Sequence, residues 1–348
     1  MNTPSEPSIP LPHRRRTRYS GKNPQRFEDK YKELHSEEHP ETISKILAAG
    51  KTPAGTHRPI MVGEILQALN PKSGETAVDG TLGYGGHSQV ILPLLQPGGR
   101  LICLDVDPIE LPKTEARLRA LGFGPDTFSA HRSNFAGIRK VLTAERMAGA
   151  DLILADLGVS SMQLDDPARG FSVKRQGPLD MRMNPQRGHS ASELLQGISP
   201  LKLERLLRDN SDEPHAGMLA DALAERDFKS TSSLCEAIRH ALPKSETEED
   251  RVKSIRRVFQ ALRIAVNEEL VALDNFLRVL PDCVNPGGRI AILTFHSGED
   301  RRVKKAFEAG LRDGLYAEIA NDPIRPSFSE IHDNPRSSSA KLRWARRA

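Results

Sequence analysis

The sequence predicts an α/β fold in which a mostly parallel, doubly wound sheet carries helices on both faces and is interrupted by a helical insertion. Three observations support this prediction. Short apolar runs alternate with amphipathic stretches between residues 56 and 156, as in βαβ units. One of these runs leads into a glycine-rich loop. No strand pattern occurs between about 160 and 254, and a buried strand pattern resumes at 289–295.

The glycine-rich loop follows the first predicted strand, Thr76 to Asp79. It carries four glycines, at Gly80, Gly83, Gly85 and Gly86. Glycine permits positive φ angles and close backbone approaches that a Cβ would block. The free N–H groups at the start of the helix that follows favour a carboxylate or a phosphate. The loop therefore predicts a cofactor site.

Two cofactors fit this loop, and a turn without a ligand is a third interpretation. The segment from Gly83 to Ser88 differs from the dinucleotide fingerprint G-x-G-x-x-G/A at one small residue. Asp105 follows at the ~20-residue distance of a ribose-binding carboxylate. Sites for S-adenosylmethionine use the same architecture, with a carboxylate after each of the first two strands. Asp79 and Asp105 stand at those two places.

The other elements are predicted from hydrophobic periodicity. Helices are expected at 64–69, 88–95, 110–121 and 138–142, and strands at 100–105, 127–131 and 151–156. Further helices are expected at 200–207, 217–226 and 232–241, followed by one long helix with an apolar stripe from Ile255 to Leu280 and by a turn at 286–288. We predict a core of 56–163 and 252–348, an insertion of 164–251, and a flexible basic and polar extension of 1–55 with one polar helix near 26–34.

Composition limits the class of protein. The chain has 348 residues, of which 37% are hydrophobic, which is enough to bury a full core. Its three cysteines are far apart and have no metal-ligand spacing, so we expect a reducing, cytoplasmic location and neither a disulfide framework nor a metal site. No apolar run approaches the ~20 residues that span a bilayer, so no membrane partner is expected. The oligomeric state is left open.

The basic residues are clustered, although the net charge is only +4. Four runs are locally positive: 14–18, 251–263, 301–305 and 341–347. Such runs are either solvated faces or surfaces that follow nucleic-acid phosphates, and four in one chain favour the second interpretation. The extension of 1–55 is interpreted as an arm that touches RNA.

Six segments resemble one family, the bacterial 16S ribosomal RNA (cytosine-N4)-methyltransferases RsmH, also called MraW. They are DGTLGYGGHS from Asp79, DLGVSSMQLDDPARGFS from Asp156, GPLDMRM from Gly177, FQALRIAVNEEL from Phe259, GGRIAILTFHSGEDR from Gly287 and NPRSSSAKLR from Asn334. They run in order through nearly all of residues 56–348. The resemblance implies a class I fold that uses S-adenosyl-L-methionine, with 16S rRNA in the small ribosomal subunit as partner.

The resemblance also implies roles for single residues. Gly85, Gly86 and His87 are implied to hold the amino-acid end of the cofactor, Asp105 its ribose, and Phe135 its adenine. Asp156 and Gln163 match two further cofactor contacts. The alternatives are a helix-capping role for His87, a core position for Phe135 and a solvent-facing position for Gln163.

The reaction implied is attack of a cytosine amino nitrogen on the sulfonium methyl group, and Asp156 is the candidate for positioning that amino group. Six residues are predicted to line the substrate site: Asp180, Arg182, Arg257, Arg263, His296 and Ser297. An internal salt bridge is an equal alternative for Asp180 and Arg182, as is a satisfied hydrogen bond for His296. An NAD-dependent oxidoreductase and a ribosome-assembly factor without activity stay open as rival functions.

Two parts of the chain depart from the family pattern. The segment 212–222 lacks the arginines that the family commonly carries there, which leaves its contact with RNA open. Residues 1–55 match no part of the pattern.

Overall fold

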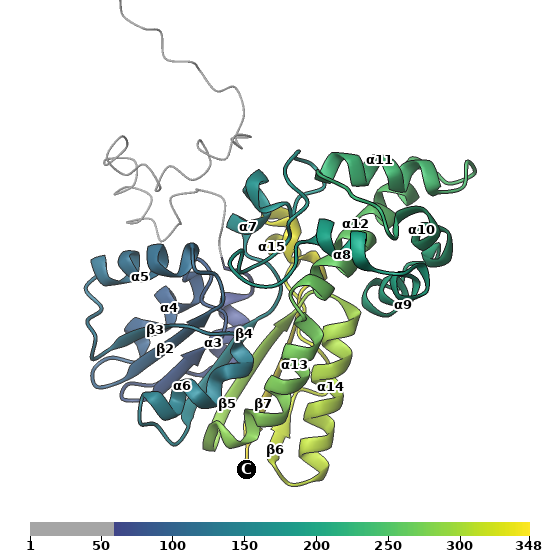
Figure 1. Ribbon diagram of the computed structural model, residues 1–348. Coiled ribbons are helices and arrows are strands. Elements are labelled where there is room, and N and C mark those ends of the chain that lie inside the picture. Colours follow the sequence, from purple (N-terminus) through teal and green to yellow (C-terminus); the bar gives the residue numbers. More distant parts are fainter. Residues whose placement is uncertain (1–58) are drawn as a thin grey trace, which may run out of the picture. The chain divides into compact units, whose positions relative to one another are not determined.

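A single seven-stranded sheet lies at the centre of the part that the computed structural model describes, residues 59–348 (Figure 1). The strands are β1 Thr76–Asp79, β2 Arg100–Asp105, β3 Phe128–Arg132, β4 Ala150–Asp156, β5 Val284–Thr294, β6 Tyr316–Ile319 and β7 Lys341–Arg347. Their order is β3-β2-β1-β4-β5-β7-β6, with β1 to β5 parallel and β7 antiparallel to both neighbours. The predicted doubly wound α/β sheet is confirmed.

Helices cover both faces of this sheet, because successive buried residues of each strand point to opposite sides. On one face the core joins α3 Val62–Leu69, α4 Gly86–Leu94 and α5 Glu110–Ala120 to the sheet; on the other it joins α6 Ile138–Ala144, α13 Glu269–Val279 and α14 Ser297–Arg312. In β1, Ala77 belongs to the first core and Val78 to the second. Because β1 to β5 run parallel, their carboxyl ends meet at one edge of the sheet, where the ligand site of such a sheet lies.

The stretch between β4 and β5 is helical and has a hydrophobic core of its own. Its helices are α7 Ser161–Asp165, α8 Ala191–Gly197, α9 Pro200–Ser211, α10 Ala216–Leu223, α11 Thr231–Ala241 and α12 Glu248–Val266. In Figure 1, α8 to α12 lie together beyond one edge of the sheet. The predicted helices at 200–207, 217–226 and 232–241 are present. The exact boundaries of the insertion, 164 and 251, stay a prediction.

The prediction of one long helix from Ile255 to Leu280 is wrong. The chain breaks into α12 and α13 at Asn267 and Glu268, and Glu268 has a left-handed φ of 50°. The Asn267 side chain donates to the carbonyls of Met181 and Arg263 and accepts from the Met183 N–H. The two long-range bonds, to Met181 and Met183, stabilise a break that the apolar periodicity does not reveal.

The basic run at 341–347 is not a free tail, which contradicts our interpretation of it as a phosphate-following surface. It forms β7, between β5 and β6. Arg343 is 5% exposed, and both it and Lys341 pair with Asp300, at 2.6 and 2.9 Å. Burial of an arginine requires such pairing, so these charges stabilise the fold.

The predicted extension of 1–55, its helix near 26–34 and the basic run at 14–18 lie outside the described residues. They stay predictions.

Candidate active site

Asp79 ends β1 and is buried, with 2% exposure. Its Oδ1 accepts a hydrogen bond from the Thr81 N–H at 3.0 Å, and its Oδ2 accepts one from Ser88 Oγ at 2.7 Å. Burial raises the pKa of this carboxyl above its ordinary value, although both hydrogen bonds act in the opposite direction. Asp79 thus ties the start of the glycine-rich loop to α4, and the structure gives it a role in shaping the loop.

The loop itself depends on glycine at two positions. Gly83 and Gly85 have φ angles of 49° and 77°. A Cβ on Gly85 would lie 2.9 Å from Thr114 Cγ2, which is closer than real Cβ atoms approach. Gly85 then caps α4, so Gly86 and His87 form its first turn. The predicted handover from strand to loop to helix is present.

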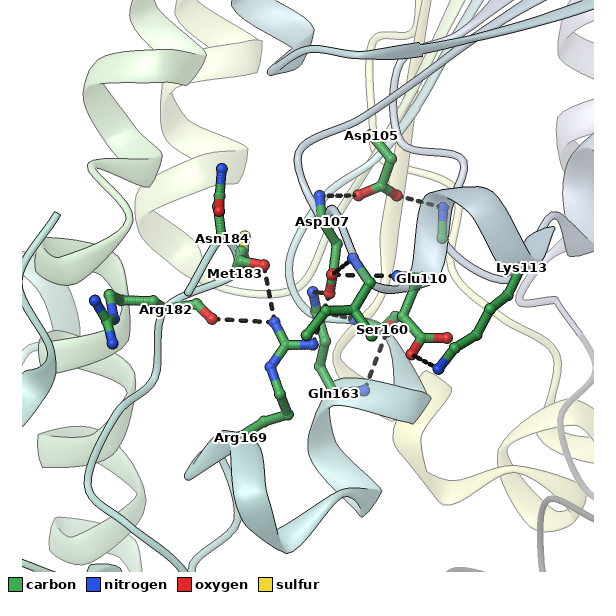
Figure 2. Close-up of polar contacts among 12 residues, drawn as sticks. Asp105, Asp107, Glu110, Lys113, Ser160, Gln163, Arg169, Arg182, Met183 and Asn184 are labelled. Atoms are coloured by element: carbon green, nitrogen blue, oxygen red, sulfur yellow. Dashed lines mark hydrogen bonds and ion pairs between the residues drawn. The ribbon is translucent and has the colours of Figure 1, made fainter. Parts of the chain in front are cut away.

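Asp105 ends β2 and faces the same loop. Its Oδ2 accepts from the Gly83 N–H at 2.6 Å and its Oδ1 from the Asp107 N–H at 2.8 Å (Figure 2). Burial raises the pKa of Asp105 from 3.8 to about 6, and the two backbone hydrogen bonds only partly oppose this. A carboxylate that is costly to ionise in the free protein favours a ligand that donates hydrogen bonds to it.

We expect the affinity for S-adenosylmethionine, measured by calorimetry, to fall as Asp105 becomes protonated. With a pKa of about 6, Kd should rise about tenfold between pH 7 and pH 5. Because the folded-state pKa lies above the unfolded value, the stabilisation from protonated Asp105 is full below pH 3.8 and is lost as pH rises through about 6. Unfolding driven by Asp105 therefore cannot explain weaker binding at pH 5.

The control is Asp105→Asn, which should bind more weakly at pH 7 and show no change in Kd between the two pH values. An equal pH dependence in the wild type and this variant would contradict the assignment of the titration to Asp105.

Asp156 ends β4, the strand on the other side of β1. Its Oδ2 lies 3.4 Å from His87 Nε2, and its backbone N–H donates to Thr81 Oγ1 at 2.6 Å. Within the described part of the chain, neither the buried Oδ1 of Asp156 nor the buried Nε2 of His87 has a hydrogen-bond partner. Buried polar atoms are almost always hydrogen-bonded in folded proteins, so an Asp156 oxygen without a partner, beside a His87 nitrogen that makes only the 3.4 Å contact to the other oxygen, indicates a ligand site. The strand-end carboxylates Asp79, Asp105 and Asp156 thus surround one loop.

Phe135 lies beside the same strand ends. Its ring packs edge to face on Phe276, with centroids 5.4 Å apart, and it contacts the core of its face of the sheet. A Cβ on Gly80 would lie 3.3 Å from the Cβ of Phe135. The half-buried ring is thus both part of the core and next to the glycine-rich loop, so the two interpretations of Phe135 are compatible.

Gln163 does not face solvent. It is 6% exposed, and its side chain caps α7 by accepting from the Ser160 N–H. Its Nε2 donates to Asp107 Oδ2 at 2.9 Å, and Arg169 Nη1 donates to the same oxygen at 2.8 Å (Figure 2). Sequence analysis missed Asp107 and Arg169. The second aspartate of LDVDP and the arginine inside a family-like segment were the available signals.

The predicted substrate residues do not form one cluster of free side chains. Asp180 and Arg182 form an ion pair at 2.7 Å, which agrees with the internal alternative. The Arg263 guanidinium donates two hydrogen bonds to Glu269, so it serves the junction of α12 and α13. Of the six predicted substrate residues, only Arg257 forms neither a hydrogen bond nor an ion pair with the described residues. It is half-buried on α12.

The last two predicted substrate residues begin α14. His296 Nε2 lies 3.3 Å from Glu299 Oε1, in an ion-pair arrangement, but it has no hydrogen bond of good geometry within the described residues. Ser297 Oγ donates to Asp212 Oδ2 at 3.1 Å. Asp212 ends α9, in the segment that lacks the family's arginines, and this segment makes contacts inside the protein. His296 thus stays a candidate, while Ser297 links two helices.

Two other kinds of feature are absent from the described residues. No group of three or more His, Cys, Asp or Glu side chains there is placed to hold a metal ion. No helix there is long and apolar enough to cross a membrane.

Comparison with known proteins decides among the candidate cofactors. Residues 54–348 match the MraW methylase family. The chain belongs to this family. It is therefore a methyltransferase with a class I fold, and S-adenosylmethionine is its methyl donor, which excludes the NAD-dependent oxidoreductase.

Members of the MraW methylase family match almost the whole chain. "Ribosomal RNA small subunit methyltransferase H 1" of Lachnoclostridium phytofermentans is 47% identical over 353 aligned residues, covering 99% of this chain and 96% of the relative. The protein of the same name from Agathobacter rectalis is 48% identical and covers 97% and 98%. Because the first of these alignments covers 99% of the chain, the interpretation that residues 1–55 match no part of the family pattern is wrong.

The residues of this MraW methylase fit its cofactor. The loop at Gly85 leaves no room for a side chain, the His87 imidazole and the Asp156 carboxylate each offer a buried atom without a hydrogen bond in the described residues, and Asp105 offers a carboxylate. A sulfonium donor carries an ammonium, a carboxylate and ribose hydroxyls, which need acceptors and N–H donors of this kind. Which residue holds which part of the cofactor stays a proposal.

Proposed function

We propose that this protein methylates the exocyclic N4 of a decoding-centre cytosine in 16S ribosomal RNA, and that it acts in the cytoplasm on the small ribosomal subunit. Its relatives from Lachnoclostridium phytofermentans and Agathobacter rectalis are named as small-subunit ribosomal RNA methyltransferases. The observation that carries the proposal is the Asp156 carboxylate, which ends β4 beside the glycine-rich loop with one oxygen unpaired within the described chain.

The bound S-adenosylmethionine supplies an electrophilic methyl group. The nitrogen of a cytosine amino group attacks poorly, because its lone pair is delocalised into the ring. A carboxylate that accepts the amino hydrogens localises this lone pair, and we assign that task to Asp156. His87, whose Nε2 is 3.4 Å from Asp156 Oδ2, restricts the orientation of the carboxylate. Correct placement of the reacting groups supplies the largest part of the acceleration in such reactions.

The target base has to leave its stack to reach a strand end, as other base-modifying enzymes require. Phosphates around it need cations that the protein does not already use. Several basic side chains on α12 and α14 form no hydrogen bond or ion pair with the described residues, and we propose four of them as phosphate contacts: Arg256, Arg257, Arg301 and Lys305. Such contacts position the RNA without selecting its sequence.

The test is methyl transfer from labelled S-adenosylmethionine to small subunits that lack the modification, with naked 16S rRNA assayed in parallel. We expect label on subunits, at N4 of one cytosine after nuclease digestion. Label on another base or atom would contradict the substrate assignment. Tight RNA binding without any label would instead favour an assembly factor that has lost the chemistry.

A further inference from the structure

Arg169 is a buried arginine that connects Asp107, at the cofactor edge of the sheet, to the segment 180–183. It ends the short 3₁₀ helix Pro167–Arg169, and its side chain is 9% exposed. Its Nη1 donates to Asp107 Oδ2 at 2.8 Å. Its Nη2 donates to the carbonyls of Arg182 and Met183, at 3.1 and 2.8 Å. One guanidinium therefore holds a carboxylate and two backbone carbonyls at once (Figure 2).

The Asp107 end of this bridge belongs to the cofactor site. Asp107 is 1% exposed, and its backbone N–H donates to Asp105 Oδ1 at 2.8 Å. Its Oδ1 accepts from the first N–H groups around the start of α5, and its Oδ2 accepts from Gln163 as well as from Arg169. A change in the position of the Asp105 carboxylate therefore acts directly on Asp107 through this hydrogen bond.

The other end of the bridge is the segment 180–183. The Met181 N–H donates to the Arg169 carbonyl at 3.1 Å, so Arg169 makes three hydrogen bonds to this segment. On its other side Asn267, at the break between α12 and α13, bonds to Met181 and Met183. The segment carries the Asp180–Arg182 ion pair, and both of these side chains are only partly buried.

We propose that Arg169 is a positioning residue that couples the cofactor end of β2 to the segment 180–183, and that this segment places the RNA substrate. The inference rests on the proposed function, because it assumes an RNA substrate. Arg169 itself touches neither reactant in this account. It acts through Asp107 on one side and through two carbonyls on the other.

Arginine suits this task and lysine does not. The guanidinium is always charged and presents N–H donors in a rigid, planar fork, so it spans three acceptors in fixed directions. A lysine ammonium at the same place keeps the charge opposite Asp107 but lacks the fork. Arg169→Lys thus keeps a charge opposite the buried carboxylate and removes the two side-chain hydrogen bonds to the segment 180–183, while the backbone bond from the Met181 N–H stays.

The experiment compares Arg169→Lys with Arg289→Lys. Arg289 also bridges a carboxylate, that of Glu75, and two carbonyls, those of Leu69 and Asn70, but it lies at the amino end of the strand pairing. For each protein we would measure Kd for S-adenosylhomocysteine, and Kd for small-subunit RNA in the presence and absence of S-adenosylhomocysteine. We would also measure kcat and KM for methylation of small subunits.

We expect S-adenosylhomocysteine to tighten RNA binding of the wild type about tenfold and of Arg169→Lys less than about twofold. KM for small subunits should rise about tenfold in Arg169→Lys, and its Kd for S-adenosylhomocysteine alone should stay within about twofold. Arg289→Lys should keep the wild-type coupling and KM. A purely structural role would change melting temperature in both variants and coupling in neither.

If Arg169→Lys does not fold, the double variant Asp107→Asn/Arg169→Gln removes both buried charges together and should lose the coupling in the same way. Wild-type coupling and KM in whichever variant folds, or an equal loss in Arg289→Lys, would overturn the role of Arg169 alone. A wild-type protein that methylates no small subunits would overturn the proposed function, and this inference with it.

Discussion

Replacing Asp156 by alanine is expected to lower kcat for methyl transfer by about 10²–10³-fold, the usual effect of removing a group that stabilises or positions the reacting atoms. Kd for S-adenosylmethionine should change by less than about tenfold, because Asp105 and the loop around Gly85 stay in place. The loss of kcat is expected because Asp156 ends β4 with one oxygen that has no hydrogen bond within the described residues and is free to accept the amino hydrogens of the cytosine. Single-turnover kinetics and calorimetry measure the two quantities separately.

Two variants control this prediction. Asp156→Asn keeps an acceptor oxygen and the shape of the side chain, and it should retain more activity than alanine. Asp151→Ala lies at the other end of the same strand, where Asp151 accepts from the Thr76 N–H and from Asn285 Nδ2, and it should reduce stability but not kcat. A loss found entirely in Kd would show that Asp156 serves the cofactor alone.

The second large effect is expected at Gly85. Gly85→Ala should raise Kd for S-adenosylmethionine at least about 100-fold and lower the free energy of unfolding by about 2–3 kcal/mol. The new Cβ would meet Thr114 Cγ2 at 2.9 Å, and Thr114 is fully buried with its Oγ1 bonded to the Gly83 carbonyl at 2.7 Å. Thr114 is held in place by its burial and by this hydrogen bond, so the glycine-rich loop has to change shape to accept the new Cβ.

Gly74→Ala is the matched control, because Gly74 has a φ of 84° but open space around its Cβ position. It should cost about 1 kcal/mol of backbone strain and leave cofactor binding unchanged. Equal effects of the two substitutions on Kd would show that strain alone, and not the contact with Thr114, accounts for the role of Gly85. Chemical denaturation and calorimetry measure both.

The sequence by itself determined the elements whose signal is local. Strand β4 was predicted because its apolar run is continuous, and the carboxyl edge followed because Asp79, Asp105 and Asp156 each end such a run. The glycine-rich loop was predicted because positive φ angles and close approaches select for glycine. These patterns depend on neighbouring residues, and so they can be read without the fold.

The tertiary structure decided everything that depends on partners distant in the chain. The helix break at Asn267 is stabilised by hydrogen bonds to Met181 and Met183, and the basic run at 341–347 forms a strand whose Arg343 and Lys341 pair with Asp300. The bridge from Asp107 through Arg169 joins residues 62 positions apart. A hydrogen bond or ion pair across such a distance leaves no periodicity in the sequence. Only folding shows which charges are available to a substrate and which are already paired.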